Sequence, residues 1–144
     1  MIGLIRQYRY PIAAWRLEFP QGSVDTSADS SVDTSGPQES MLHAARRELH
    51  EESGLTASTL LSLGTFHESY GLSACECHVF LAKVETSASP NPEYTEILLG
   101  PVWLSAEGFW HHVASGDISD GPSIAAMGLL FQQANADLRA SIHL

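Results

Sequence analysis

Three glutamates lie close together in the segment RELHEESGL, residues 47–55. Each residue of a helix turns by about 100°, so Glu48, Glu51 and Glu52 would fan across about 100° of one helix surface. Like-charged neighbours repel one another, and a divalent cation would remove that repulsion. Mg²⁺ prefers carboxylate oxygens and keeps open coordination positions for substrate phosphates. The segment therefore predicts a cation site, and the alternative is an acidic helix face exposed to water.

These carboxylates need a helix to carry them, and residues 37–53 have the signals of one. Ser35 is a candidate N-cap, Pro37 suits the first turn, and Gly54 suits the C-terminal stop. Sequence patterns predict strands at 2–9, 14–19, 59–66, 75–84 and 96–104, and helices at 105–114 and 123–138. This mixed order predicts an α+β domain in which one sheet packs against helices.

The charge of the chain limits the ligands that it can bind. Its 144 residues, 44% of them hydrophobic, suit one compact domain over 1–144. Lys and Arg number 7 against 17 Asp and Glu, which gives a formal net charge of −10. We expect neither nucleic acid nor an anionic membrane as a partner, because both need clustered cations. An anionic ligand would have to be bridged by a metal or by a few arginines.

The cysteines and the N-terminal sequence bear on the cellular compartment. MIGLIRQYRY lacks the order of basic, apolar and small residues that is typical of a signal peptide, and no apolar run approaches the ~18 residues of a membrane span. We therefore expect a cytoplasmic protein. Cys75 and Cys77 are expected to be reduced thiols, since two cysteines alone cannot form a structural zinc site.

Residues 23–35 differ in composition from the rest of the chain. They read SVDTSADSSVDTS, and the pentapeptide SVDTS occurs twice. Side chains of this kind cannot fill a core, so the segment is expected to be a flexible surface loop inserted into the domain.

The segment from Glu39 to Leu55 resembles the Nudix box, G-x5-E-x7-R-E-U-x-E-E-x-G-U, in which U is aliphatic. Eight of the nine defined positions match at the required spacing: Glu39, Arg47, Glu48, Leu49, Glu51, Glu52, Gly54 and Leu55. Asp33 stands where the pattern has its first glycine. Gly22 is the expected box glycine, although 16 residues lie between it and Glu39, where the pattern has five. Gly36 is the competing candidate.

Flanking segments are similar to one branch of this family, the ADP-ribose and nucleoside-diphosphate-sugar pyrophosphatases. They are IRQYR (5–9), LEFPQG (17–22), SYGLS (69–73) and HVFLA (78–82). Tyr70 stands where that branch typically has a proline, and a tyrosine in this neighbourhood is associated with dinucleoside polyphosphate hydrolases. The resemblance implies the α+β Nudix fold, with a mixed β-sheet sandwiched between helices.

The resemblance also implies a metal centre. Glu48, Glu51 and Glu52 would hold one to three Mg²⁺ or Mn²⁺ ions, together with the backbone carbonyl of Gln21. Arg47 would orient a carboxylate through a charge-assisted hydrogen bond. These ions would neutralise the pyrophosphate oxygens and activate a water.

Further residues would act on the substrate. Glu96 is the expected general base on a loop before a late strand, and Glu93 is the alternative. The residues expected to contact the substrate are Arg6, Arg9, Glu18 and Tyr70.

The reaction implied is metal-dependent cleavage of ADP-ribose or a nucleotide sugar into a nucleoside monophosphate and a sugar phosphate. Three alternatives remain: a dinucleoside polyphosphate or nucleoside triphosphate hydrolase, a non-catalytic nucleotide-binding module, and an acidic interaction domain. The intact set of glutamates argues against the non-catalytic module. Relatives in this branch are usually homodimers, so a homodimer is expected.

Overall fold

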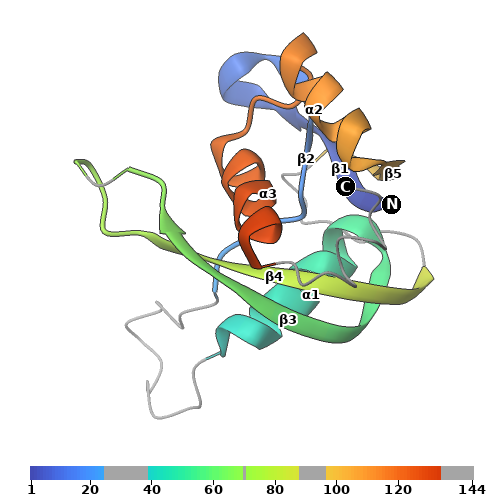
Figure 1. The fold of residues 1–144 in the computed structure, drawn as a ribbon, viewed down its shortest axis with the longest axis vertical. Helices are drawn as coiled ribbons and strands as arrows, with labels where there is room; N and C mark the ends of the chain where they lie inside the picture. The colour runs from blue at the N-terminus through green and yellow to red at the C-terminus, as the bar shows by residue number, and fades with distance from the viewer. Residues whose placement is uncertain (25–38, 70, 88–96, 134–144) are drawn as a thin grey trace.

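The computed structural model of the chain describes residues 1–24, 39–69, 71–87 and 97–133 (Figure 1). Its elements, in chain order, are β1 (Ile2–Arg9), a short 3-10 helix (Tyr10–Ile12), β2 (Ala14–Glu18), α1 (Met41–Ser53), β3 (Leu55–His67), β4 (Glu76–Ser87), β5 (Leu98–Leu104), α2 (Ala106–Ser115) and α3 (Gly121–Gln133). The expected α+β class is confirmed. None of the described helices is long and apolar enough to cross a membrane.

The described strands form two sheets, both of them antiparallel. One sheet has the order β2-β1-β5, and the other is the long hairpin of β3 and β4. The sequence pattern predicts a single sheet. It does not indicate the division into two, because strand patterns show which segments are extended but not which segments pair. Helix α1 links the two sheets, because it contacts β3 and β4 of the hairpin and β5 of the other sheet.

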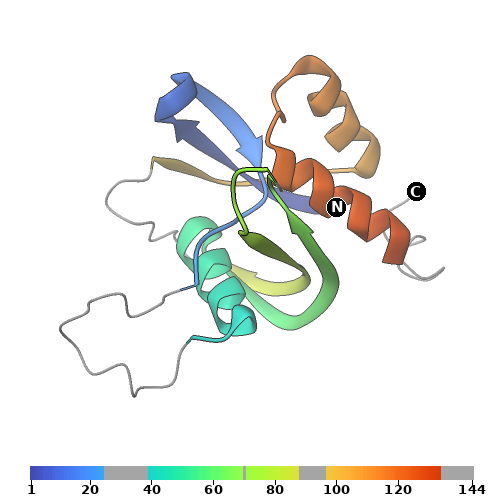
Figure 2. The same ribbon diagram turned by 90° about the vertical axis from the view of Figure 1, so that its left-hand side faces the viewer.

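Helices cover both faces of the β3–β4 hairpin. Both α1 and α3 contact this hairpin, and Figure 2 shows it lying between them. Leu63 of β3 also joins the main hydrophobic core, which includes Leu4 and Leu17 of the other sheet and Met127 of α3. One core therefore holds the two sheets together, as burial of apolar surface requires.

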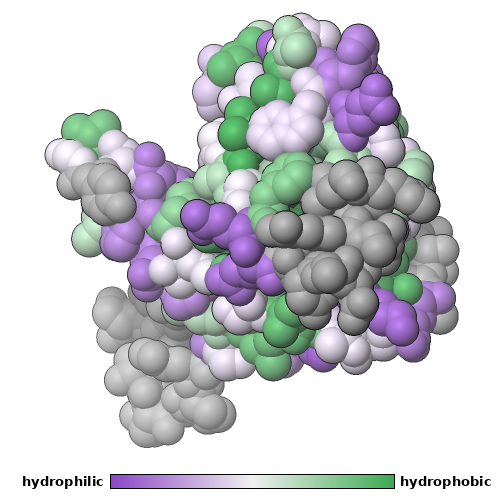
Figure 3. All heavy atoms as spheres, in the orientation of Figure 1, coloured by the Kyte–Doolittle hydropathy of each residue, from purple (hydrophilic) through white to green (hydrophobic). Residues whose placement is uncertain are grey.

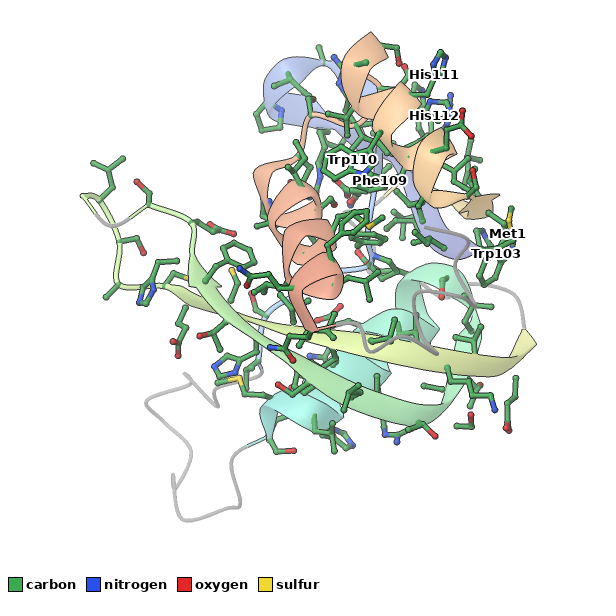
Figure 4. The ribbon with its side chains drawn as sticks, in the orientation of Figure 1. Met1, Trp103, Phe109, Trp110, His111 and His112 are labelled. Carbon is green, nitrogen blue, oxygen red and sulfur yellow. The ribbon has the colours of Figure 1, made fainter. Side chains whose placement is uncertain are left out.

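Helix α2 contributes aromatic side chains to this core. Phe109 is fully buried and stacks on Phe19, with ring centroids 5.6 Å apart. Trp110 stacks on Phe131 of α3, with centroids 6.1 Å apart. Figure 4 shows Phe109 and Trp110 on the side of α2 that faces α3, and His111 and His112 on its outer side. The segment just after β2 is thereby anchored to α2.

Helix α1 begins later than the sequence analysis expected. Its N-cap is Ser40, whose Oγ accepts the N–H of His43 at 3.2 Å. Ser35, the expected N-cap, lies outside the described residues. The helix ends as expected at Gly54, whose φ of 70° is left-handed and favours glycine.

Successive residues of β1 point to opposite faces of its sheet, and both faces are covered. Leu4 faces the core under α2 and α3, whereas Ile5 is equally buried on the other face. That second face also carries two buried polar side chains, Gln7 on β1 and Glu18 on β2. A buried polar face is unusual for a sheet of this size and indicates a functional surface.

The other end of this sheet exposes apolar side chains. The side chains of Tyr10, Ile12 and Leu99 are 63%, 55% and 53% exposed. Tyr8 contacts Tyr10 and Trp15 edge to face. In Figure 3, green apolar residues lie among white and purple ones over the upper part of the molecule, where the turn between β1 and β2 lies above α3.

Candidate active site

Arg47 is the centre of the charged cluster on α1. Its Nε and Nη2 donate to the two carboxylate oxygens of Glu39, each at 3.1 Å. Its Nη1 donates to Glu48 at 2.9 Å and to Glu51 at 3.0 Å. These contacts, above all that with Glu39, hold the pKa of the guanidinium well above its ordinary range, so the group stays charged. One arginine therefore orients three carboxylates, where the sequence analysis expected it to orient one.

The segment 19–23, which leaves β2, lies directly against this helix. The N–H of Gln21 donates to Glu52 Oε2 at 2.8 Å, and the carbonyl of Ser23 accepts from Arg47 Nη2 at 2.9 Å. Between them, a Cβ added to Gly22 would lie 2.0 Å from Cδ of Glu48. Only a residue without a side chain leaves this carboxylate where it is. Gly22 thus faces the carboxylate helix, as expected, and Gly36, the competing candidate, lies outside the described residues.

Glu52 is buried, which differs from the exposed helix position that the spacing suggested. Its side chain is 1% exposed, whereas those of Glu48 and Glu51 are 16% and 31% exposed. The segment with Gln21 covers it, and helical geometry alone does not predict such a cover. A buried carboxylate needs hydrogen-bond donors or a cation, and the Gln21 N–H is one such donor.

The chemistry of this cluster suits a hard divalent cation, because carboxylate oxygens are the ligands that such ions prefer. In their present positions, however, no three His, Cys, Asp or Glu side chains of the described ranges converge on one point that could hold a metal ion. Glu48 and Glu51 instead share Nη1 of Arg47. Both carboxylates would have to turn from Arg47 toward an ion, and their side chains are 16% and 31% exposed.

Two of the expected substrate contacts lie together on the buried polar face of the first sheet. Arg9 binds Glu18 through two contacts, Nε to Oε2 at 3.1 Å and Nη2 to Oε1 at 2.6 Å. The side chain of Glu18 is 2% exposed and that of Arg9 is 38% exposed. Glu18 directly precedes the segment 19–23, so this ion pair and the carboxylate cluster are joined by a few residues of chain.

The structure places Arg6 on the opposite face of β1 from Arg9. Arg6 pairs with Leu17, a core residue under α2, and its side chain is exposed. The side chain of His112 lowers the pKa of Asp117, and Arg6 adds to this effect. Arg6 is therefore not brought together with Arg9 and Glu18. The sequence already indicates this separation, because side chains alternate between the two faces of a strand and positions 6 and 9 differ by an odd number.

Several expected residues cannot be placed. Tyr70, Glu93 and Glu96 lie outside the described residues, as does the segment 23–35 apart from its first two residues. Conversely, Asp120 and Ser123 at the start of α3 were not singled out from the sequence. Ser123 accepts a hydrogen bond from Phe19 N at 2.9 Å, which ties α3 to the segment 19–23.

Comparison with known proteins gives two matches that bear on this site. The family model of the NUDIX domain matches residues 2–126. Among solved structures, a crystal structure of an ADP compounds hydrolase aligns with a TM-score of 0.71 and 22% identity. The alignment covers 90% of this chain and 64% of the hydrolase chain. This chain therefore spans about 64% of the length of that hydrolase. No curated protein matches the chain.

Proposed function

The chain belongs to the Nudix family, and from that premise we propose that it is a metal-dependent pyrophosphohydrolase of ADP-ribose or a related nucleotide sugar. The products would be a nucleoside monophosphate and a sugar phosphate. One observation carries the proposal: Glu48, Glu51 and Glu52 share one helix surface that is closed on one side by the segment 19–23. The fold it shares with an ADP compounds hydrolase agrees with this substrate class.

The proposed metal ligands are Glu48, Glu51, Glu52 and the backbone carbonyl of Gln21. Nudix enzymes generally use a divalent metal, and Mg²⁺ or Mn²⁺ fits a donor set made only of oxygens. Such an ion neutralises phosphate oxygens and lowers the pKa of a bound water. Arg47 would remain with Glu39 when the other carboxylates turn to the ion, because that contact is bidentate.

The chain's own residues would then bind and orient the substrate. Arg9 is connected to the site through its ion pair with Glu18, and its partly exposed guanidinium retains donors for a phosphate or ribose oxygen. Glu18 fixes the guanidinium of Arg9 through two contacts. Its proposed substrate contact is to accept a hydrogen bond from a ribose hydroxyl. Glu96 is the proposed general base, with Glu93 as the alternative, and Tyr70 is proposed to contact the distal half of the substrate.

A substrate panel tests the proposal. The protein would be incubated with ADP-ribose, nucleotide sugars, diadenosine polyphosphates and nucleoside triphosphates, each with Mg²⁺ or Mn²⁺, and the products separated by chromatography. Release of AMP from ADP-ribose, lost in Glu52→Gln and kept in Glu107→Gln, is the expected result. Glu107 is an exposed glutamate in the first turn of α2 and serves as the matched control. Cleavage of diadenosine polyphosphates alone would favour the dinucleotide alternative.

We also propose a homodimer. The exposed apolar residues Tyr10, Ile12 and Leu99 at one end of the first sheet support it, because exposed apolar side chains gathered in one region of a surface commonly mark an interface. Light scattering coupled to size exclusion would give the mass. A monomer at micromolar concentration would contradict this part of the proposal.

A further inference from the structure

Helix α3 begins with a hydrogen-bonded pair that the proposed reaction does not use. Asp120 Oδ2 accepts both the N–H of Ser123, at 2.8 Å, and the Ser123 hydroxyl, at 2.7 Å. This is the pattern of an N-cap aspartate, which satisfies an otherwise unpaired N–H of the first helical turn. The hydroxyl of Ser123 is thereby held in one orientation, with its lone pairs free for another donor.

That donor comes from a distant part of the chain. The N–H of Phe19 donates to Ser123 Oγ at 2.9 Å, and Ser123 is 1% exposed. A cap needs only Asp120, so the second role of Ser123, as acceptor for Phe19, is additional. The ring of Phe19 also stacks on Phe109 of α2. Backbone and side chain of Phe19 are therefore both fixed by helices outside the carboxylate cluster.

From Phe19 the restraint passes to the carboxylate cluster through two residues. Pro20 follows, and its ring locks its own φ and restricts the backbone of the residue before it. Gln21 comes next, and its N–H donates to the buried Glu52 at 2.8 Å. Ser123 thus constrains where the backbone contacts Glu52, because the stretch of chain between the two hydrogen bonds is short and stiff.

We propose that Ser123, oriented by Asp120, is a positioning residue for the metal site: it fixes Phe19 and, through Pro20, sets the place of Gln21 against Glu52. The inference rests on the proposed function, because it assumes that Glu52 and the Gln21 carbonyl bind the metal. Residues that orient metal ligands without touching the ion typically change metal affinity by 10- to 100-fold when they are removed.

The test compares two serines at the starts of helices: Ser123 in the first turn of α3, and Ser105, the N-cap of α2. Ser123→Ala removes the acceptor for Phe19. Ser105→Ala is the matched control, because Ser105 Oγ accepts Gly108 N at 3.0 Å at the start of α2 and makes no hydrogen bond to the segment 19–23 among the described residues. Mn²⁺ binding to the full chain would be measured by electron paramagnetic resonance of the free ion, alongside melting temperature and the kcat and KM for ADP-ribose.

We expect Ser123→Ala to raise the Kd for Mn²⁺ at least about 10-fold and to lower kcat more than it raises KM. Ser105→Ala should lower the melting temperature but leave the Kd within twofold. Ser123→Thr, which keeps the hydroxyl, should restore most of the affinity. Equal Mn²⁺ affinity in Ser123→Ala and Ser105→Ala would overturn the inference.

A milder change tests the inference if Ser123→Ala fails to fold. Asp120→Asn keeps an oxygen for the Ser123 N–H but weakens the acceptor of its hydroxyl, and it should shift the Kd in the same direction. If it does not, the inference is wrong. Failure of the proposed function has another signature: wild type and Glu52→Gln would then bind Mn²⁺ equally.

Discussion

Replacement of Gly22 by alanine should remove activity while leaving the fold intact. The added Cβ would lie 2.0 Å from Cδ and 2.1 Å from Oε1 of Glu48. Ordinary contact begins at 3.4 Å, so the carboxyl group must move by about 1.4 Å or more. It can do so cheaply, because it is the end of a flexible side chain, and Gly22 does not have a positive φ that alanine would resist.

The size of the effect follows from this displacement. A misplacement of about 1 Å in a catalytic constellation can cost about 10²-fold in rate. That factor corresponds to about 2.7 kcal/mol in the activation free energy. Stability should change little, since alanine in place of a compatible glycine stabilises a protein by about 0.4–1 kcal/mol and the moved carboxylate offsets part of this gain.

The assay is steady-state hydrolysis of ADP-ribose with Mg²⁺, read as AMP by chromatography, next to a thermal melt. Gly100→Ala is the matched control, because a Cβ there meets nothing within 4 Å. The expected result is a kcat at least about 10²-fold lower for Gly22→Ala than for Gly100→Ala, with cooperative melting in both. Turnover of Gly22→Ala within threefold of the control would refute the reasoning that the Glu48 carboxyl group needs the space that Gly22 leaves open.

Four further predictions are simpler to test. Glu52→Gln should lower kcat at least about 10²-fold at unchanged KM, as expected when a transition-state contact through a metal is lost; activity within threefold of wild type would contradict the site. Deletion of residues 24–34 should leave a cooperative melting transition, because loop length changes stability little; a broad, non-cooperative melt would show that the segment is structural. Tyr70→Ala and Tyr70→Pro should lower kcat/KM for a dinucleoside polyphosphate more than for ADP-ribose if the ring stacks on a second base, and equal losses would reject that role. Burial and Glu68 raise the pKa of Cys77 to about 11, so iodoacetamide at pH 8 should label the exposed Cys75 first by mass spectrometry; equal rates would argue against this environment.

The helix and its carboxylates could be predicted from the sequence, because they depend on local spacing. Glu48, Glu51 and Glu52 share a surface through helical geometry, and Gly54 ends the helix through its left-handed backbone. Gly22 could be chosen over Gly36 only by analogy with the family pattern. Its contact with Glu48 gives a physical reason for that choice.

Other features depend on how distant segments pack, and the sequence offers little signal for them. The burial of Glu52 requires the segment 19–23 to lie over α1, a contact between residues 31 positions apart. The split into two sheets depends on strand pairing, which strand patterns leave open. The role of Asp120 had a detectable signal, an aspartate just before a helix that opens with Gly121 and Pro122. The hydrogen bond between Phe19 and Ser123, which are 104 positions apart, had no detectable signal in the sequence.

Arg47 also contacts residues at both ends of the inserted segment 23–35: Ser23, its first residue, and Glu39, four residues after it. Its Nη2 donates both to the Ser23 carbonyl, at 2.9 Å, and to Glu39, at 3.1 Å. One guanidinium therefore holds Ser23 and Glu39 close together, whatever the length of the chain between them. Evolution can lengthen, shorten or recompose such a stretch without disturbing the chemistry beside it. The same property makes this position a natural place to graft a reporter peptide or a guest domain onto the proposed enzyme.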